Sequence, residues 1–167
     1  VGDVVSIPLS SLTLPKTPDT AFTQLLALDP LPVSALKNAT LQSCFSFSHF
    51  NPVQTQCFFA LYNSQQSVVI GAPTGSGKTV LAELAMFPCL AAKRVVVYIA
   101  PMKALVAERI ADWKEKLAST LNLRVVELTG DSSASQHELR AAHIIVTTPE
   151  KFEVSTRFLE GEDSLLQ

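Results

Sequence analysis

The chain has 167 residues, of which 47% are apolar and only 17% are charged. Charged residues make up about 25% of an ordinary soluble domain, so the composition argues against intrinsic disorder. A well-buried α/β core would explain this composition, which nevertheless favours a piece of a larger assembly whose partner surfaces are absent. Thirteen Lys and Arg against fifteen Asp and Glu leave a formal net charge of −2, so any binding of nucleic acid must depend on a local group of residues.

Residues 1–30 differ in texture from the rest of the chain. Residues 6–14 alternate small or polar with apolar side chains, which with Pro8 is typical of an edge strand. Pro15, Pro18 and Pro30 then punctuate a connector. We therefore expect residues 1–30 to be the tail of a preceding module with a linker, and residues 31–167 to be one partial domain.

After a short helix expected within residues 32–43 and an aromatic cluster of Phe45, Phe47 and Phe50, strand and helix patterns alternate. The expected strands are residues 67–70, 94–100, 123–128 and 143–147. The expected helices are residues 78–90, 106–117 and 135–141, with a fourth that opens at Pro149.

Two details sharpen this expectation. Pro88 is expected to kink the helix over residues 78–90 or to end it early. The β-branched run over residues 94–100 is typical of a strand covered on both faces. The alternation predicts an α/β fold, in which a parallel β-sheet is flanked by helices and connected by right-handed crossovers.

The cysteines and the hydropathy of the chain indicate in which cellular compartment the protein works. Cys44, Cys57 and Cys89 are isolated in apolar sequence, which favours reduced thiols over disulfides or zinc ligands and predicts a nuclear or cytoplasmic protein. The longest near-apolar stretch, residues 80–92, contains Glu83 and is shorter than the roughly 18 residues that span a membrane. We expect no membrane partner.

The strongest chemical motif is GAPTGSGKT, residues 71–79, between a strand pattern and a helix pattern. Gly75 and Gly77 would let the backbone amides converge on one anion, and the start of the helix would add its positive end. Lys78 would contact the β and γ phosphates, and the Thr79 hydroxyl would hold Mg²⁺. The motif predicts a phosphate loop for a nucleotide, although Ala72 stands where the strict pattern has Gly.

Further motifs surround this loop. FNPVQ, residues 50–54, places the Gln54 amide where it would recognise an adenine edge. The segments APMKAL, LTGD and TTPEK, residues 100–105, 128–131 and 147–151, each follow an apolar strand pattern. Because the carboxyl ends of parallel strands share one edge of a sheet, these turns should gather beside the phosphate loop. Helix starts and lysines there would bind phosphates.

In this order, FNPVQTQ, GAPTGSGKT, APMKALVAER, LTGD and TTPEK resemble the first RecA-like domain of superfamily 2 nucleic-acid helicases. The sequences of these motifs are most similar to those of the Ski/Brr group, whose members carry two helicase cassettes in one chain. The segment PLPVSAL before FSHFNPVQTQ resembles the start of the C-terminal cassette.

The resemblance implies a role for each motif residue. Gln54 corresponds to the residue that recognises adenine. The triphosphate and Mg²⁺ would be held by Ala72, Pro73, Thr74, Gly75, Ser76, Gly77, Lys78 and Thr79. Contacts along single-stranded nucleic acid, either RNA or DNA, would come from Pro101, Lys103, Thr129, Gly130, Thr148, Pro149 and Lys151.

By this resemblance the parent protein is an ATP-dependent helicase, whose partners are single-stranded nucleic acid, the rest of the cassette and the protein subunits of a larger complex. The family's acidic metal-positioning motif should follow beyond Gln167, so the chain alone is expected to bind ATP weakly and to hydrolyse essentially none. Two alternatives stay open. The cassette would be a catalytically silent platform for protein partners, or the chain would be another phosphate-loop enzyme, such as a kinase or a transporter ATPase.

Overall fold

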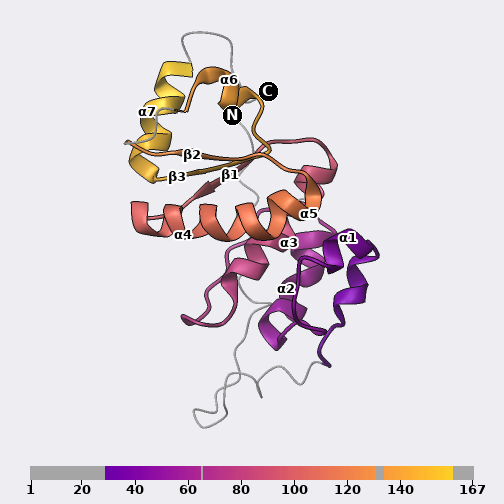
Figure 1. Cartoon of the computed structure of the whole chain (residues 1–167). Coiled ribbons are helices and arrows are strands. Elements are labelled where there is room, and N and C mark those ends of the chain that lie inside the picture. Colours follow the sequence, from indigo (N-terminus) through magenta and orange to yellow (C-terminus); the bar gives the residue numbers. More distant parts are fainter. Residues whose placement is uncertain (1–28, 65, 131–133, 160–167) are drawn as a thin grey trace.

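The structure is a computed structural model that describes residues 29–64, 66–130 and 134–159 (Figure 1). The edge strand expected over residues 6–14 and most of the linker expected within residues 1–30 lie outside the described residues.

The first described segment wraps an aromatic cluster. The 3-10 helix η2 (Val33–Leu36) ends at Lys37, whose φ is 52°, and helix α1 (Ala39–Gln42) begins after it. The single short helix expected within residues 32–43 is therefore two, because the left-handed Lys37 interrupts it and the Asn38 side chain caps a new helix start. The expected aromatic cluster is confirmed, since the Phe45 and Phe50 ring centroids lie 5.7 Å apart.

Helices α2 (Pro52–Tyr62) and α3 (Lys78–Ala91) pack against each other beneath the sheet in Figure 1. Helix α3 continues past Pro88, so the expectation that this proline ends the helix early is wrong. Pro88 lies in the last turn, where its missing N–H removes only one intrahelical bond, and its own carbonyl accepts from the Ala92 amide at 3.0 Å.

The described sheet is parallel, as predicted. Strands β1 (Val96–Ile99), β2 (Val125–Leu128) and β3 (Ile144–Thr147) lie in the order β1-β3-β2. All three begin one or two residues later than expected, and β1 also ends one residue earlier. Their carboxyl ends are level, because Thr147 pairs with Ile99 on one side and with Leu128 on the other.

Helices cover this sheet from both sides (Figure 1). On one side lies α4 (Lys103–Trp113), which continues through a π-helical turn, η3 (Lys114–Ala118), into α5 (Ser119–Leu121). On the other side lie α6 (Gln136–Arg140) and α7 (Pro149–Leu159), which begins at the predicted proline.

Two predictions about strands are wrong. Residues 67–70 form no strand, and Val69 is 97% exposed, because no described strand lies alongside to complete a hydrogen-bonded ladder. Strand β1 is half-buried rather than covered on both faces: Val96, Val97 and Tyr98 are half-buried and Ile99 is exposed, because the described elements do not fully cover it.

The core lies between α3, α4 and the sheet. Its most deeply buried large side chains include Phe50, Leu84, Val106, Trp113 and Ile144. None of the helices in the described part of the chain has the length and apolar character needed to cross a membrane.

Candidate functional site

The GAPTGSGKT motif folds as a tight loop at the start of α3. Gly75 and Gly77 have φ values of 82° and 80°, in the left-handed region that glycine adopts without strain, and Gly77 is the N-cap of α3. The first-turn amides of a helix have no intrahelical acceptor and point toward the preceding loop, where the helix dipole adds positive potential. This is the backbone arrangement that binds a phosphate anion.

Asn51 and Gln54 brace the loop from behind. They form a capping box at the start of α2, in which the Gln54 amide donates to Asn51 Oδ1 at 2.9 Å and the Asn51 amide donates to Gln54 Oε1 at 3.0 Å. Their side-chain nitrogens then reach the loop: Asn51 Nδ2 donates to the Ser76 carbonyl at 3.0 Å, and Gln54 Nε2 donates to the Gly77 carbonyl at 3.3 Å. Sequence reasoning missed Asn51, although the N-P-x-Q spacing of a capping box is a recognisable signal.

Gln54 is buried behind the loop. A primary amide carries two N–H donors and two oxygen lone pairs, and the protein uses one of each. The remaining donor and acceptor are the pair that an adenine edge would need, so the role predicted for Gln54 is compatible with its geometry and stays a prediction.

The loop also carries groups that fit a polyphosphate. The Lys78 ammonium lies over the loop and donates to the carbonyls of Ala72 and Pro73, both at 2.7 Å. Ser76 Oγ is the one buried side-chain oxygen or nitrogen atom in the described residues that lacks a hydrogen-bond partner. A buried hydroxyl without a partner is costly, and a phosphate oxygen would satisfy it. Left-handed glycines, a lysine and an unpaired hydroxyl together fit ATP.

Thr79 is the residue that the sequence predicts as a ligand of Mg²⁺. It lies half-buried in the first turn of α3, directly after Lys78. In the described residues, no cluster of three or more His, Cys, Asp or Glu side chains is arranged to hold a metal ion. Since Mg²⁺ takes oxygen ligands and binds through one or two carboxylates with the phosphates, Thr79 fits one hydroxyl ligand of such a site.

The three later motifs meet at one edge of the sheet, as predicted. Because Ile99, Thr147 and Leu128 are level, the turns that follow them begin side by side. The Lys103 ammonium lies 3.9 Å from the position of a Cβ on Gly130, which brings the first two turns into contact. Thr147 Oγ1 donates to the Leu128 carbonyl at 2.6 Å, a tie between strand ends that sequence reasoning missed.

The predicted nucleic-acid residues differ in exposure. Pro101, Lys103, Gly130 and Pro149 are exposed, and Lys151 is half-buried. Thr129 and Thr148 are buried, and Thr129 Oγ1 donates to Glu127 Oε1 at 2.8 Å. The two threonine side chains therefore support the turns from within, which leaves their backbone for any contact with a ligand.

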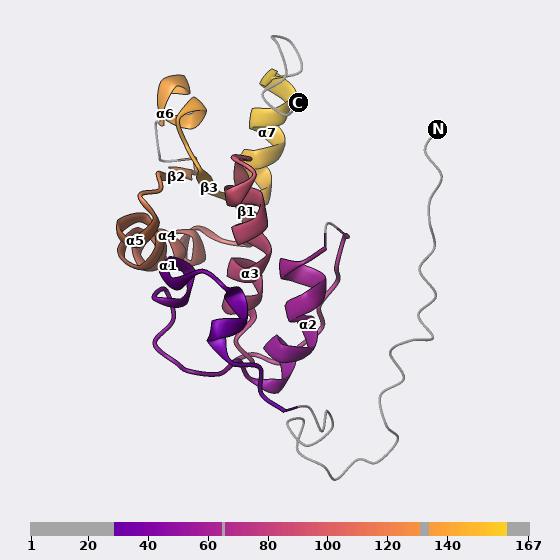
Figure 2. The same cartoon turned by 90° about the vertical axis from the view of Figure 1, so that its right-hand side faces the viewer.

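A short reversal connects the helix that follows the phosphate loop to the sheet. Helix α3 ends at the Ala92 cap, Lys93 turns the chain with φ 57°, and the Arg94 amide bonds back to the Cys89 carbonyl at 2.9 Å. This short reversal connects α3 directly to β1, and Figure 2 shows α3 beside α2. The shared edge predicted for the three strand-end turns is confirmed, and the predicted position of the phosphate loop at the same edge stays a prediction.

This arrangement agrees with a family comparison. A model of the DEAD/DEAH box helicase family matches residues 51–164, which contain the phosphate loop and all three strand-end turns. The chain belongs to the DEAD/DEAH box helicase family. The alternative of a kinase or a transporter ATPase is therefore wrong.

Curated relatives narrow the position within this helicase family. The chain is 50% identical over 153 residues to activating signal cointegrator 1 complex subunit 3 of Dictyostelium discoideum, covering 90% of this chain and 7% of that protein. It is 49% identical over 142 residues to the RQC trigger complex helicase SLH1 of Saccharomyces cerevisiae, covering 83% of this chain and 7% of that protein. The resemblance to the Ski-type helicases is confirmed, and the chain spans about 7% of the length of these relatives.

Solved structures confirm the fold. The DUF1998 helicase MrfA bound to DNA and AMPPNP superimposes with a TM-score of 0.57 at 23% identity, covering 73% of this chain and 18% of that chain. A hypothetical ATP-dependent RNA helicase from Sulfolobus tokodaii superimposes with a TM-score of 0.54 at 22% identity, covering 75% of this chain and 36% of that chain. The described domain is RecA-like, as predicted.

Proposed function

We propose that this chain is the nucleotide-binding part of a helicase motor that uses ATP to move along single-stranded RNA or DNA and to separate duplexes. The observation that carries the proposal is the combination of a glycine loop with a lysine at the start of α3 and the level ends of β1, β3 and β2, whose following turns lie at one edge of the sheet. We infer that the loop faces this edge, because α3 is joined to β1 by a short reversal. With a nucleotide and a nucleic-acid strand bound along this edge, binding of one would change binding of the other through the short segments that join the two sites. The name of one relative, the RQC trigger complex helicase SLH1, supports the same proposal.

In the proposed nucleotide site, each residue has a distinct role. The amides that follow Gly75 and Gly77 hold the phosphates, and the Ser76 hydroxyl gains the partner that it lacks among the described residues. Lys78 exchanges the carbonyls of Ala72 and Pro73 for phosphate oxygens, and Thr79 offers its hydroxyl to Mg²⁺. Bound Mg²⁺ supplies neutralisation of the charge that develops on the γ-phosphate.

Nucleic acid would be held by its backbone. Pro101, Lys103, Gly130, Pro149 and Lys151 surround the level strand ends, and the starts of α4 and α7 direct amides toward the same space. Backbone contacts carry no base code, so we expect binding that tolerates any sequence and weakens with salt.

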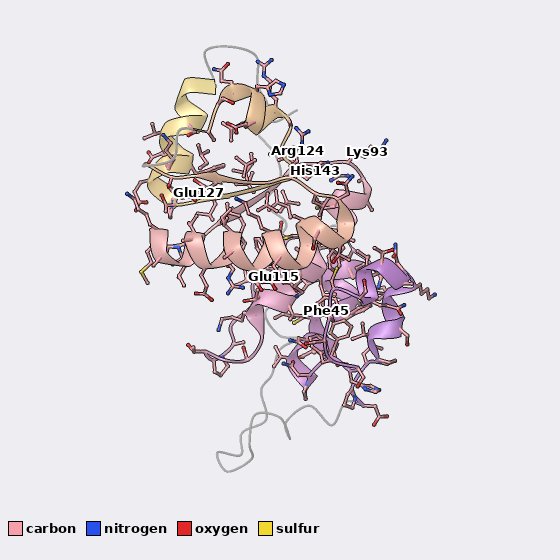
Figure 3. All side chains as sticks on the ribbon, viewed as in Figure 1. Phe45, Lys93, Glu115, Arg124, Glu127 and His143 are labelled. Carbon is pink, nitrogen blue, oxygen red and sulfur yellow. The ribbon has the colours of Figure 1, made fainter. Side chains whose placement is uncertain are left out.

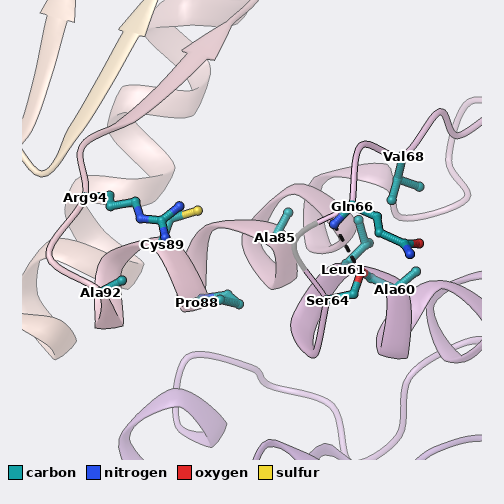
Figure 4. A pocket seen from close by; sticks show the side chains of 10 residues that line it. All are labelled: Ala60, Leu61, Ser64, Gln66, Val68, Ala85, Pro88, Cys89, Ala92 and Arg94. Atoms are coloured by element: carbon teal, nitrogen blue, oxygen red, sulfur yellow. Dashed lines mark hydrogen bonds between the residues drawn. The ribbon is translucent and has the colours of Figure 1, made fainter. Parts of the chain in front are cut away.

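We also propose that the rest of the cassette covers the apolar surface beside β1. A shallow groove of about 320 Å³, lined mainly by the faces of α2 and α3, opens next to the exposed Val68 (Figure 4). Val95 lines a neighbouring hollow that shares Ala85 and Cys89 with this groove, and Val95 is exposed. Exposed apolar surface around a groove is typical of an interface.

A substitution at Gln54 tests the nucleotide assignment. In Gln54→Ala, the spare donor and acceptor for an adenine edge are lost, so we expect ATP affinity to fall toward the affinity for GTP, measured by calorimetry in the full-length helicase. Thr55→Ala, a neighbouring polar residue whose hydroxyl bonds to the Phe50 carbonyl at 3.2 Å, is the matched control and should keep the preference for ATP. An unchanged ATP to GTP ratio in Gln54→Ala would reject adenine recognition by this residue.

A further inference from the structure

A single carboxylate joins α3 to α4 inside the core. Glu83 is the only charged residue that is buried in the described part of the chain, with 1% of its side chain exposed. Its Oε1 accepts from the indole Nε1 of Trp113 at 3.0 Å, and its Oε2 pairs with the Lys116 ammonium at 2.6 Å. Both oxygens are therefore held by groups from the end of α4 and the turn that follows.

Stability alone does not explain this group. Removing a carboxylate and an ammonium from water costs several kcal/mol, and a well-packed apolar pair in their place is often as stable or more stable. What a fully bonded buried ion pair does supply is a fixed geometry, because leaving either charge without its partner is costly. Here that geometry is the position of α3 relative to α4.

The partner residues are held by features of their own. Lys116 lies in the π-helical turn η3, a local widening of the helix that occurs often at functional sites. Its ammonium also lies 4.6 Å from the centre of the Phe45 ring, a cation–π contact that ties the ion pair to the aromatic cluster. The Trp113 ring meets Tyr98 of β1 edge to face, with centroids 4.8 Å apart.

Each side of this contact leads to one of the two ligand sites. On α3, Glu83 follows Thr79 by four residues, about one helical turn, so it moves with the start of the phosphate loop helix. On the other side, Trp113 is the last residue of α4, whose first residue is Lys103, and Tyr98 is the penultimate residue of β1. The Pro101–Lys103 turn is thus bounded by the strand and the helix that Trp113 joins to Glu83.

We propose that Glu83 is a positioning residue that couples the nucleotide loop to the nucleic-acid turn. A shift of α3 when the loop closes on phosphates is passed through the Glu83 carboxylate to Trp113 and Lys116, and from them to α4 and β1. By linkage, a strand bound at the turn changes nucleotide affinity by the same factor. This inference rests on the proposed function, since it needs both ligands to bind at the shared edge.

The test measures coupling in the full-length helicase. The probes are ATP with a single-stranded oligouridylate, and the readouts are the oligouridylate stimulation of ATP hydrolysis and the ratio of oligouridylate affinities with and without AMPPNP. In Glu83→Gln, we expect both ratios to fall by at least about fivefold, which is the lower end of usual coupling between sites. Lys116→Met, which keeps the Trp113 bond and replaces a 24% exposed side chain, should lower them in the same direction. The double variant should lose little more than either single variant, because both act through one contact.

Glu115→Gln is the matched control, since Glu115 lies exposed in the same turn as Lys116, and it should leave both ratios unchanged. If Glu83→Gln and Lys116→Met lower the thermal midpoint but keep the ratios, Glu83 is merely structural and the inference is overturned. If Glu83→Gln does not fold, the ratios of Lys116→Met decide. Failure of the proposed function would appear in the unmodified protein, as absence of any stimulation, whereas failure of this inference appears only in the variants.

Discussion

Gln54 and Gly77 are in direct contact behind the phosphate loop: Gln54 Nε2 donates to the Gly77 carbonyl at 3.3 Å, and a Cβ on Gly77 would lie 2.3 Å from that nitrogen. Gly77→Ala must therefore both strain a backbone with φ 80° and displace Gln54. The left-handed conformation alone costs about 1 to 2 kcal/mol for a residue with a Cβ. Because Gly77→Ala also displaces Gln54, we expect its unfolding free energy, measured with urea, to fall by more than this conformational cost. We expect its ATP affinity to fall about tenfold or more.

The other loop glycines provide graded controls. A Cβ on Gly75 would meet nothing within 4 Å, so Gly75→Ala should lower the unfolding free energy only by the cost of the left-handed conformation at φ 82°. Gly71→Ala also meets nothing within 4 Å and has no positive φ, so its stability should be nearly unchanged. Equal losses in the three variants would contradict the close contact between Gly77 and Gln54.

Lys78→Ala separates binding from stability. The Lys78 ammonium is exposed and donates to two loop carbonyls, so its removal should change the unfolding free energy by no more than about 0.5 kcal/mol. ATP affinity, measured by calorimetry, should fall by tenfold or more, because the phosphates lose their point charge. Lys114→Ala, an exposed lysine in η3, is the control and should bind ATP normally. An unchanged ATP affinity in Lys78→Ala would contradict the proposal that this loop binds the phosphates of ATP.

Lysines at opposite edges of the sheet should differ in their effect on nucleic-acid binding. Lys103 lies at the carboxyl edge, whereas Lys93 lies with Arg124 and His143 near the amino ends of the strands (Figure 3). In the full-length helicase, Lys103→Ala should weaken binding of single-stranded oligonucleotides about equally for all sequences and reduce the slope of log K against log salt by about 1. Lys93→Ala should leave the slope as it is. If Lys93→Ala reduced the slope instead, the nucleic acid would bind at the amino ends of the β-strands.

The chain of 167 residues by itself should bind ATP weakly and turn over essentially none. Hydrolysis needs the attacking water, the metal and the γ-phosphate charge to be handled together, and the described residues hold no carboxylate cluster for the metal. The measurement is phosphate release with Mg²⁺ and ATP. Turnover that disappears in Lys78→Ala would show that the chain completes the site on its own.

The thiols predict a loss of stability at high pH. Burial raises the pKa of Cys44, an effect that Lys116 opposes and Glu83 reinforces, and burial also raises the pKa of Cys57. A pKa that is higher in the folded state stabilises the protein fully below the unfolded thiol pKa of about 8.5, and this contribution is lost as the pH rises through the folded value. The thermal midpoint should therefore fall more steeply above pH 9 in the unmodified chain than in a Cys44→Ala, Cys57→Ala variant. If the thermal midpoints of the two proteins changed with pH in parallel, the buried thiols would not be the cause of the loss of stability.

Local sequence signals predicted the motif-bearing elements well. The helix that begins at Lys78, three of the four predicted strands and the helix that opens at Pro149 form, because glycine turns, β-branched runs and a proline at the first helical position act over a few residues. The gathering of the three strand-end motifs at one edge also followed from sequence, since parallel strands joined by helices must all end on the same side. Pro88 was misjudged because one missing bond in a last turn is small beside the packing of α3.

Contacts between distant residues depend on the folded chain. Nothing in the local pattern shows that Asn51 and Gln54 brace residues 76 and 77, that Glu83 meets Trp113 and Lys116, or that Thr147 ties β3 to β2. The apolar run over residues 67–70 likewise reads as a strand, yet a strand needs a neighbour to accept its backbone hydrogen bonds, and no described strand lies there. Propensity is a property of a segment, whereas pairing and burial belong to the segments around it, and for this reason only the assembled structure could place them.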